Sequence, residues 1–269
     1  MDEFVGVITK EEYISDDLIK DVLFLIGGKY PLRLGNAGCE FSISNNHNLS
    51  ELKTVRGMDV DVNIIPKKNR EKKIIVADMD STLINEECID ELAKFTGIAD
   101  KILPITKKSM NGEISFLNSL VERTSLFKGL NSKALEECFL NCISLSKGAK
   151  ILISTMNSRS AKSYIISGGY NFFVSKIAEI LSVTDYFSNN IMLEGDKFSG
   201  KLVKPIIHEM EKLKILKKIC KNNNLKLKDV LAVGDGANDM KMLESSGLGV
   251  AYKSKKIVKS CTNIHFDFS

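Results

Sequence analysis

The stretch from Ile74 to Thr82, IIVADMDST, decides the fold of this chain. Its first four residues are apolar and lead without interruption into Asp78 and Asp80. A short unbroken apolar run of this kind predicts a strand that is buried on both faces of a parallel sheet. Ligands bind at the carboxyl ends of such strands, where the two aspartates stand. By itself an Asp-x-Asp pair is more often an ordinary turn, so the interpretation depends on the rest of the chain.

Two later apolar runs also end in polar residues and glycines. Tyr164–Ile166 leads into Ser167-Gly168-Gly169, and Val230–Val233 leads into the stretch GDGAND at 234–239. A Lys-rich amphipathic helix that contains Lys212 is predicted between these two runs. The carboxyl ends of parallel strands meet at one edge of a sheet, so we expect these polar groups to form one site.

The order of the predicted elements indicates an α/β fold. From about residue 149 onward strand and helix patterns alternate, which is typical of a doubly wound, Rossmann-like parallel sheet. Residues 86–148 show helical periodicity and no strand run, and they are interpreted as a small helical cap inserted into the core. The core then consists of residues 71–85 and 149–269, with further strands expected at 248–251 and 264–266.

Residues 1–70 are predicted to form a small α+β domain of their own. Apolar residues between Leu18 and Ile26 indicate a helix that ends at Gly27-Gly28. Near the end of this domain, apolar Val60, Val62 and Ile64 alternate with Asp59, Asp61 and Asn63. This alternation predicts a half-exposed strand. Pro66 and the basic residues 67–73 are interpreted as a solvated linker.

Composition and charge argue against several classes of function. The net charge of +4 is spread over many Lys/Glu pairs, so nucleic-acid or membrane binding is not expected. The six cysteines form no Cys-x-x-Cys pair and the three histidines are scattered, which argues against a zinc site. No signal peptide is recognisable, and Leu23–Ile26 is too short to span a bilayer. We expect a soluble protein of the reducing cytoplasm.

The motifs resemble those of a known superfamily. The order D-x-D-x-T, S-G-G, Lys and G-D-G-x-N-D is similar to that of the haloacid dehalogenase-like phosphatases, over roughly residues 58 to 255. The stretch Asp78–Gly97, DMDSTLINEECIDELAKFTG, resembles the phosphoserine phosphatases within that superfamily. The N-terminal domain is faintly similar to the ACT-like extension that some of these enzymes carry.

Two neighbouring carboxylates suit a reaction in which one attacks an electrophile and the other moves a proton. The resemblance implies that Asp78 is the nucleophile, which forms an aspartyl-phosphate, and that Asp80 is the general acid and base. It implies an Mg²⁺ ion held by Asp78, the backbone carbonyl of Asp80, Asp235 and Asp239, an oxygen-rich set that suits this cation.

The resemblance also assigns the residues that hold the substrate. Ser167, the N–H of Gly168 and Lys212 would hold the phosphoryl oxygens, and Asn238 would bond the phosphate or the substrate. Most of the lysines nearby must be surface charges, and the resemblance assigns this role to Lys212, with Lys214 as the alternative, because Lys212 stands seven residues after Pro205, as the family's lysine does after its own proline or equivalent.

Two charged residues of the predicted cap are expected to read the amino-acid end of the substrate. Glu87 would meet its ammonium group and Arg123 its carboxylate, with Met110 and Phe116 alongside.

The expected function is the Mg²⁺-dependent hydrolysis of O-phospho-L-serine to L-serine and phosphate, the last step of serine biosynthesis. One alternative is a related enzyme that acts on another small phosphomonoester, or that transfers the phosphoryl group to a second alcohol such as homoserine. Another is a regulatory protein that senses an amino acid. The expected partner is a small-molecule substrate, and a homodimer is left open.

Overall fold

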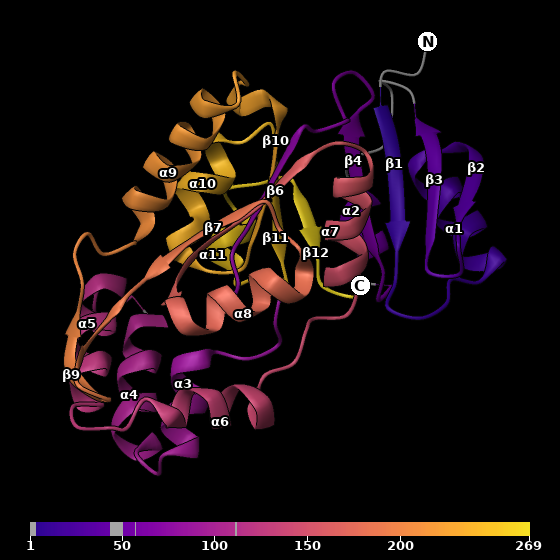
Figure 1. The fold of residues 1–269 in the computed structure, drawn as a ribbon. Helices are drawn as coiled ribbons and strands as arrows, with labels where there is room; N and C mark the ends of the chain where they lie inside the picture. Colours follow the sequence, from indigo (N-terminus) through magenta and orange to yellow (C-terminus); the bar gives the residue numbers. More distant parts are fainter. Residues whose placement is uncertain (1–3, 44–50, 57, 111) are drawn as a thin grey trace.

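A computed structural model describes residues 4–43, 51–56, 58–110 and 112–269 (Figure 1). Its centre is a parallel sheet of six strands in the order β12-β11-β10-β5-β6-β7, which confirms the predicted α/β fold. The strands are β5 (Ile74–Ala77), β6 (Lys162–Tyr170), β7 (Asp185–Asn189), β10 (Val230–Gly234), β11 (Leu248–Tyr252) and β12 (Ile264–Phe266).

Strand β5 is buried on both faces, as its sequence predicts. Ile75 and Ala77 belong to one apolar core of the sheet, whereas Ile74 and Val76 belong to the other. Helices α7 (Ala149–Ser158) and α8 (Asn171–Leu181) contribute to the first core, and α9 (Glu209–Asn222) and α10 (Met240–Ser245) to the second. None of the described helices combines the length and the apolarity that a membrane span requires.

The position of β5 explains why its carboxyl end forms a site. Although β5 comes first among the six strands in the chain, it lies between β6 and β10. The chain therefore adds β6 and β7 on one side of β5, and then crosses over to add β10, β11 and β12 on the other side. Ligands bind at such switch points, outside the carboxyl ends of the strands. This topology places Asp78, the Ser167-Gly168 pair and Asp235 at neighbouring strand ends.

Among the described residues, four helices lie between β5 and α7. They are α3 (Cys88–Phe95), α4 (Ala99–Met110), α5 (Phe116–Leu126) and α6 (Lys133–Cys142), and we call them the cap (Figure 1). The segments that enter and leave the cap pair with each other, because Asn85 N donates to Ser144 O at 3.1 Å and Ser146 N donates to Leu83 O at 2.9 Å. Glu86 reinforces this pairing by accepting from the backbone N–H and the hydroxyl of Ser144.

A β-hairpin that the sequence analysis did not anticipate packs against the cap. It consists of β8 (Ile191–Glu194) and β9 (Lys197–Leu202), and β9 lies against α5. The fully buried ring of Phe198 on β9 lies 6.2 Å from that of Phe127 and 6.4 Å from that of Tyr170. Gly195, in the turn, has a φ of +64°, a conformation that glycine adopts readily. The turn sequence EGDK at 194–197 could have indicated this hairpin.

The N-terminal residues form a separate antiparallel sheet with its own apolar core. The strand order is β2-β3-β1-β4. Helix α1 ends at Gly27, as predicted, because Gly27 takes the left-handed conformation. The elements are β1 (Phe4–Thr9), α1 (Asp16–Ile26), β2 (Lys29–Leu34), β3 (Gly38–Ile43), α2 (Leu52–Arg56) and β4 (Asp61–Pro66).

The prediction that this last strand is half exposed is wrong. Asp61 and Asn63 on β4 are both buried, because their face is covered by β12 and the residues that follow it. The amide of Asn63 donates to His265 O at 2.8 Å and accepts from His265 N at 2.9 Å. The carboxylate of Asp61 accepts from the backbone N–H groups of Asp267 and Phe268 at 2.7 and 2.9 Å. Alternation of apolar and polar residues shows that the two faces of a strand differ, but the polar face can still be buried when its polar groups are hydrogen-bonded.

These contacts predict that Asp61 stabilises the whole chain. The substitution Asp61→Ala leaves two backbone N–H groups of the C-terminal residues without their acceptor, and should lower the free energy of unfolding by about 2–4 kcal/mol. Urea denaturation measures this change. Asp21→Ala, at an exposed position of α1, serves as the control and should change stability by less than about 0.5 kcal/mol. Equal stability of the two variants would contradict the proposed role of Asp61.

Candidate active site

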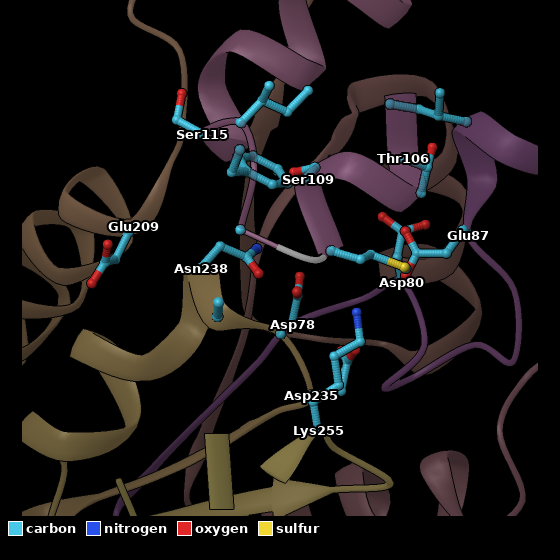
Figure 2. Close-up of a pocket in the computed structure, with 18 of the residues that line it drawn as sticks. Asp78, Asp80, Glu87, Thr106, Ser109, Ser115, Glu209, Asp235, Asn238 and Lys255 are labelled. Atoms are coloured by element: carbon cyan, nitrogen blue, oxygen red, sulfur yellow. The ribbon is translucent and has the colours of Figure 1, made fainter. Parts of the chain in front are cut away.

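A cavity of about 500 Å³ lies between the carboxyl ends of the central strands and the cap (Figure 2). Asp78 and Asp235 lie on the side formed by the sheet, whereas Glu87 and Thr106 lie on the side formed by the cap (Figure 2). Three of the residues proposed from the sequence, Ser167, Lys212 and Asp239, are buried and do not line the cavity. Those that line it are Asp78, Asp80, Glu87, Arg123, Gly168, Asp235 and Asn238.

The ammonium group of Lys212 joins two carboxylates at the end of β5. Its Nζ lies 2.9 Å from Oδ1 of Asp78 and 2.7 Å from Oδ1 of Asp239, and the side chain of Lys212 is wholly buried. Burial alone would lower the pKa of this lysine, but the charges of Asp239 and Asp78 outweigh burial and raise it. Lys214, the alternative from the sequence, instead pairs with Glu211 on the surface. The geometry therefore distinguishes Lys212 from Lys214.

The acidic residues around Asp78 are more numerous than a single lysine can neutralise. Carboxylate oxygens of Asp78, Asp235 and Asp239 lie within 4.8 Å of one another. Burial and then the charge of Asp239 raise the pKa of Asp235 well above its usual range, although Asp235 accepts from Thr82 Oγ1 at 2.9 Å. Burial and then Asp78 raise the pKa of Asp239 to about 7. A divalent cation fits these donors, because it would offset the repulsion that raises both pKa values.

Asp80 lies next to Asp78 with its carboxylate held by the start of the cap. Oδ1 of Asp80 accepts from the backbone N–H of Cys88, the first residue of α3, at 2.9 Å. Burial and then the negative charge of Asp78 raise the pKa of Asp80 to about 6. A carboxyl group with a pKa near neutrality is suited to both giving and taking a proton.

The glycines near the end of β6, Gly168 and Gly169, are required by close approach rather than by backbone conformation. A Cβ atom on Gly168 would lie 2.5 Å from the ring of Phe116, a cap residue. A Cβ atom on Gly169 would lie 2.8 Å from Oδ2 of Asp80. The hydroxyl of Ser167 accepts from Gly169 N at 2.9 Å, so it lies beside the same carboxylate. The two glycines therefore allow the strand end, the acid and the cap to meet.

The cap contributes one acidic and one basic side chain to the cavity wall, Glu87 and Arg123. Glu87 precedes α3 and accepts from the hydroxyl of Ser81 at 2.8 Å. Burial and then the charge of Asp80 raise the pKa of Glu87 to about 8. Arg123 on α5 is buried and faces the same cavity. Met110 and Phe116, which were expected beside them, also line the wall.

Several lining residues were not identified from the sequence. Lys255 stands in the run KSKK at 253–256, which has the composition of an exposed surface, and Thr106 stands in a helix without any recognisable motif. Asp90, whose carboxylate lies 3.6 Å from Nη1 of Arg123, could have been suspected from its spacing, because it follows Glu87 by three residues at the start of α3. The lining residues that were missed include Ile89, Thr106, Ser109, Ser115, Glu209, Lys255 and Ile257.

Comparison with known proteins identifies the family. The model of the haloacid dehalogenase-like hydrolases matches residues 72–247, which contain every residue proposed for the site. The chain belongs to this family. A phosphoserine phosphatase from Lactococcus lactis is 40% identical over 73% of this chain and 90% of its own length. A phosphoserine phosphatase from Archaeoglobus fulgidus is 38% identical over 76% of this chain, which spans 59% of that longer relative.

One solved structure resembles the catalytic part of this chain in sequence and fold, and a second resembles the whole chain in fold. A structure of a phospho-aspartyl intermediate analogue of phosphoserine phosphatase is 36% identical, with a TM-score of 0.69, and covers 74% of this chain and 94% of its own. A hydrolase of the same family from Salmonella enterica serovar Typhi covers 100% of this chain and 95% of its own, with a TM-score of 0.89. Since that protein is 24% identical, it supports the fold of the whole chain, including the N-terminal sheet, and nothing finer.

The buried contacts of Lys212 yield a prediction. The substitution Lys212→Gln leaves Asp78 and Asp239 without a cation, which should lower the free energy of unfolding by about 3–5 kcal/mol. Hydrolysis of p-nitrophenyl phosphate should also fall, by about two powers of ten or more. Lys214→Gln is the matched control, because it removes a lysine of the same helix from the surface. Wild-type turnover by a folded Lys212→Gln variant would exclude a role of this ammonium in the reaction.

Proposed function

We propose that the protein hydrolyses O-phospho-L-serine to L-serine and inorganic phosphate. The observation that carries this proposal is that Glu87 and Arg123 both stand on the cap side of the cavity that Asp78 and Asp80 also line. Burial raises the pKa of Glu87, and a bound ammonium group would lower it and favour the carboxylate. The amino-acid end of the substrate is a zwitterion, and a carboxylate with a guanidinium complements it. The sequence relatives and a substrate-bound phosphoserine phosphatase structure that is 35% identical support the same substrate.

The two carboxylate oxygens of Asp78 have different roles in the first chemical step. Both the ammonium of Lys212 and the backbone N–H of Met79 contact Oδ1. Among the described residues, no hydrogen bond to Oδ2 is found, and we assign the attack on phosphorus to this oxygen. A bond forms between Oδ2 and phosphorus while the ester bond to the serine oxygen breaks, and Asp80 gives its proton to that oxygen.

The second step returns both aspartates to their starting state. Asp80, now ionised, takes a proton from a water molecule as the water oxygen attacks phosphorus. The bond between phosphorus and Asp78 breaks, which releases phosphate and restores the carboxylate. The raised pKa of Asp80, about 6, suits a group that serves as acid in one step and as base in the next.

The phosphoryl group is held by residues that neutralise its charge. Gly168 and Asn238 line the cavity, whereas Ser167 and Lys212 lie directly behind residues that line it, Gly169 and Asp78. The three neutral groups would donate hydrogen bonds to the phosphoryl oxygens, and Lys212 would supply the positive charge. Asp78, the carbonyl of Asp80, Asp235 and Asp239 would hold Mg²⁺. When bound, Mg²⁺ would reduce the repulsion between the phosphate dianion and the attacking carboxylate.

The last step of serine biosynthesis, as the setting of this reaction, stays a prediction from the sequence. Transfer of the phosphoryl group to a second alcohol is an outcome that a substrate panel must test. The cytoplasmic location, the homodimer and the faint ACT-like resemblance of residues 1–70 stay predictions from the sequence.

The two charged cap residues predict a selective loss. Arg123→Ala leaves the substrate carboxylate without its partner, so kcat/KM for phosphoserine should fall by about two powers of ten. Glu87→Gln should act in the same way through the ammonium group. Hydrolysis of p-nitrophenyl phosphate, which lacks an amino-acid end, should change much less, and this comparison within each variant controls for damage to the fold. Equal losses on both substrates would reopen the question of the substrate.

The acidic cluster predicts a requirement for a divalent cation. EDTA should abolish release of phosphate from phosphoserine, and Mg²⁺ should restore it. Ca²⁺ prefers more ligands at longer distances, so it should bind the cluster and inhibit. Assays with added alcohols, homoserine among them, measure phosphate and phosphorylated acceptor together. Full activity in metal-free buffer would contradict the proposed cation site.

A further inference from the structure

Behind Arg123 lies a pair of buried residues that the catalytic mechanism does not use. Asp90 on α3 and Thr106 on α4 are both buried, and the hydroxyl of Thr106 donates to Asp90 Oδ1 at 2.7 Å. The same hydroxyl oxygen accepts from Nη1 of Arg123 at 3.1 Å. Thr106 also lines the cavity, on the cap side (Figure 2). Its hydroxyl therefore connects an acid to the guanidinium at the wall of the substrate cavity.

The direction of these bonds fixes how Arg123 is held. A hydroxyl has one proton, and the short contact to Asp90 occupies it, so the lone pairs of the oxygen face Arg123. The direct separation of 3.6 Å between Nη1 of Arg123 and Asp90 Oδ1 is too long for a hydrogen bond. Nη1 therefore bonds the hydroxyl of Thr106 and not the carboxylate of Asp90. Asp90 acts on the guanidinium through its charge and through its hydrogen bond with Thr106.

One end of the guanidinium is left for a ligand. Nε of Arg123 points to Ser119 O at 3.4 Å, and Nη1 is bonded to Thr106. Among the described residues, no hydrogen bond from Nη2 of Arg123 is found, although the side chain is buried. Because Arg123 lines the cavity, a carboxylate bound there can accept a hydrogen bond from Nη2. The planar group can then meet a carboxylate with two parallel bonds if its plane is already fixed.

We propose that Thr106, bonded to Asp90, is a positioning residue that orients Arg123 for the carboxylate of the substrate. This inference rests on the proposed function. Its consequence is that Thr106 contributes to binding of the amino-acid end and not to breaking the phosphate ester, since it lies on the wall opposite Asp78. Removing its hydroxyl releases Nη1 and lets the guanidinium rotate, which weakens a contact that depends on the orientation of its plane.

A purely structural role of Thr106 gives a different expectation. Its hydroxyl joins α3, α4 and α5, so under a purely structural role its loss would loosen the cap. A loosened cap affects every substrate, because the cap closes one side of the cavity whatever that cavity holds. A positioning role affects only substrates that carry a carboxylate, and only while Arg123 is present.

The experiment compares phosphoserine with phosphoethanolamine, which differs from it by the absence of the carboxylate. Steady-state kcat and KM are measured for wild type, Thr106→Val, Thr106→Ser, Arg123→Ala and the double variant Arg123→Ala/Thr106→Val. Thr106→Val keeps the shape of the side chain and removes the hydroxyl, whereas Thr106→Ser keeps the hydroxyl. Thr96→Val is the matched control, because the hydroxyl of Thr96 donates to Leu92 O within α3 and does not line the cavity.

The expected results differ between the two substrates and among the variants. Thr106→Val should lower kcat/KM for phosphoserine by about tenfold, mainly by raising KM. It should change kcat/KM for phosphoethanolamine by less than about twofold. Thr106→Ser should restore most of the loss, and Thr96→Val should resemble wild type. In the Arg123→Ala background the Thr106→Val substitution should cause no further loss, because a residue that acts through Arg123 has nothing left to orient.

Two kinds of failure are distinguishable. Equal losses on both substrates in Thr106→Val, wild-type selectivity in that variant, or a further loss in the double variant would each overturn the positioning role while the proposed function stands. A wild-type protein that hydrolyses phosphoethanolamine as well as phosphoserine would overturn the proposed function, and the role of Thr106 with it.

Discussion

The ammonium group of Lys212, buried between Asp78 and Asp239, is the interaction on which the rest of the site depends. Buried carboxylates at one strand end repel one another, and burial raises the pKa values of Asp80, Asp235 and Asp239. Lys212 holds the carboxylates of Asp78 and Asp239 in place through one oxygen of each and leaves Oδ2 of Asp78 without a bond to the ammonium. The remaining negative charge makes the strand end a site for a divalent cation and, through it, for a phosphate dianion.

The two sides of the cavity perform different tasks. The sheet supplies the charged groups that break and form bonds to phosphorus, and these lie on strand ends that are fixed by two apolar cores. The cap supplies Glu87 and Arg123, which we propose select the substrate, and the paired linkers at residues 83–85 and 144–146 connect it to the core. Substitutions in the cap therefore change which ester is hydrolysed, and substitutions at the sheet change whether any ester is hydrolysed.

The sequence predicted those features that depend on local pattern. The apolar run before Asp78 predicted a buried parallel strand, and the order of strand and helix patterns predicted the α/β fold. It did not predict that Asp61 and Asn63 are buried, because alternation cannot show what covers a polar face. Nor did it predict the hairpin β8–β9 or the role proposed for Thr106, since these depend on contacts between segments far apart in the chain. Lys212 was chosen over Lys214 by resemblance, and the structure supplies the physical reason for the choice: one lysine is buried among carboxylates and the other is exposed.

The central claim is that Asp78 carries the phosphoryl group during hydrolysis of phosphoserine. Rapid-quench analysis with phosphoserine labelled in its phosphate, followed by peptide mapping, tests this claim most directly. We expect acid-stable label on Asp78 in the wild-type protein within the first turnover, and none in Asp78→Asn, whose turnover should be lower by about three powers of ten or more. Label on a different residue, or undiminished hydrolysis by Asp78→Asn, would contradict the account.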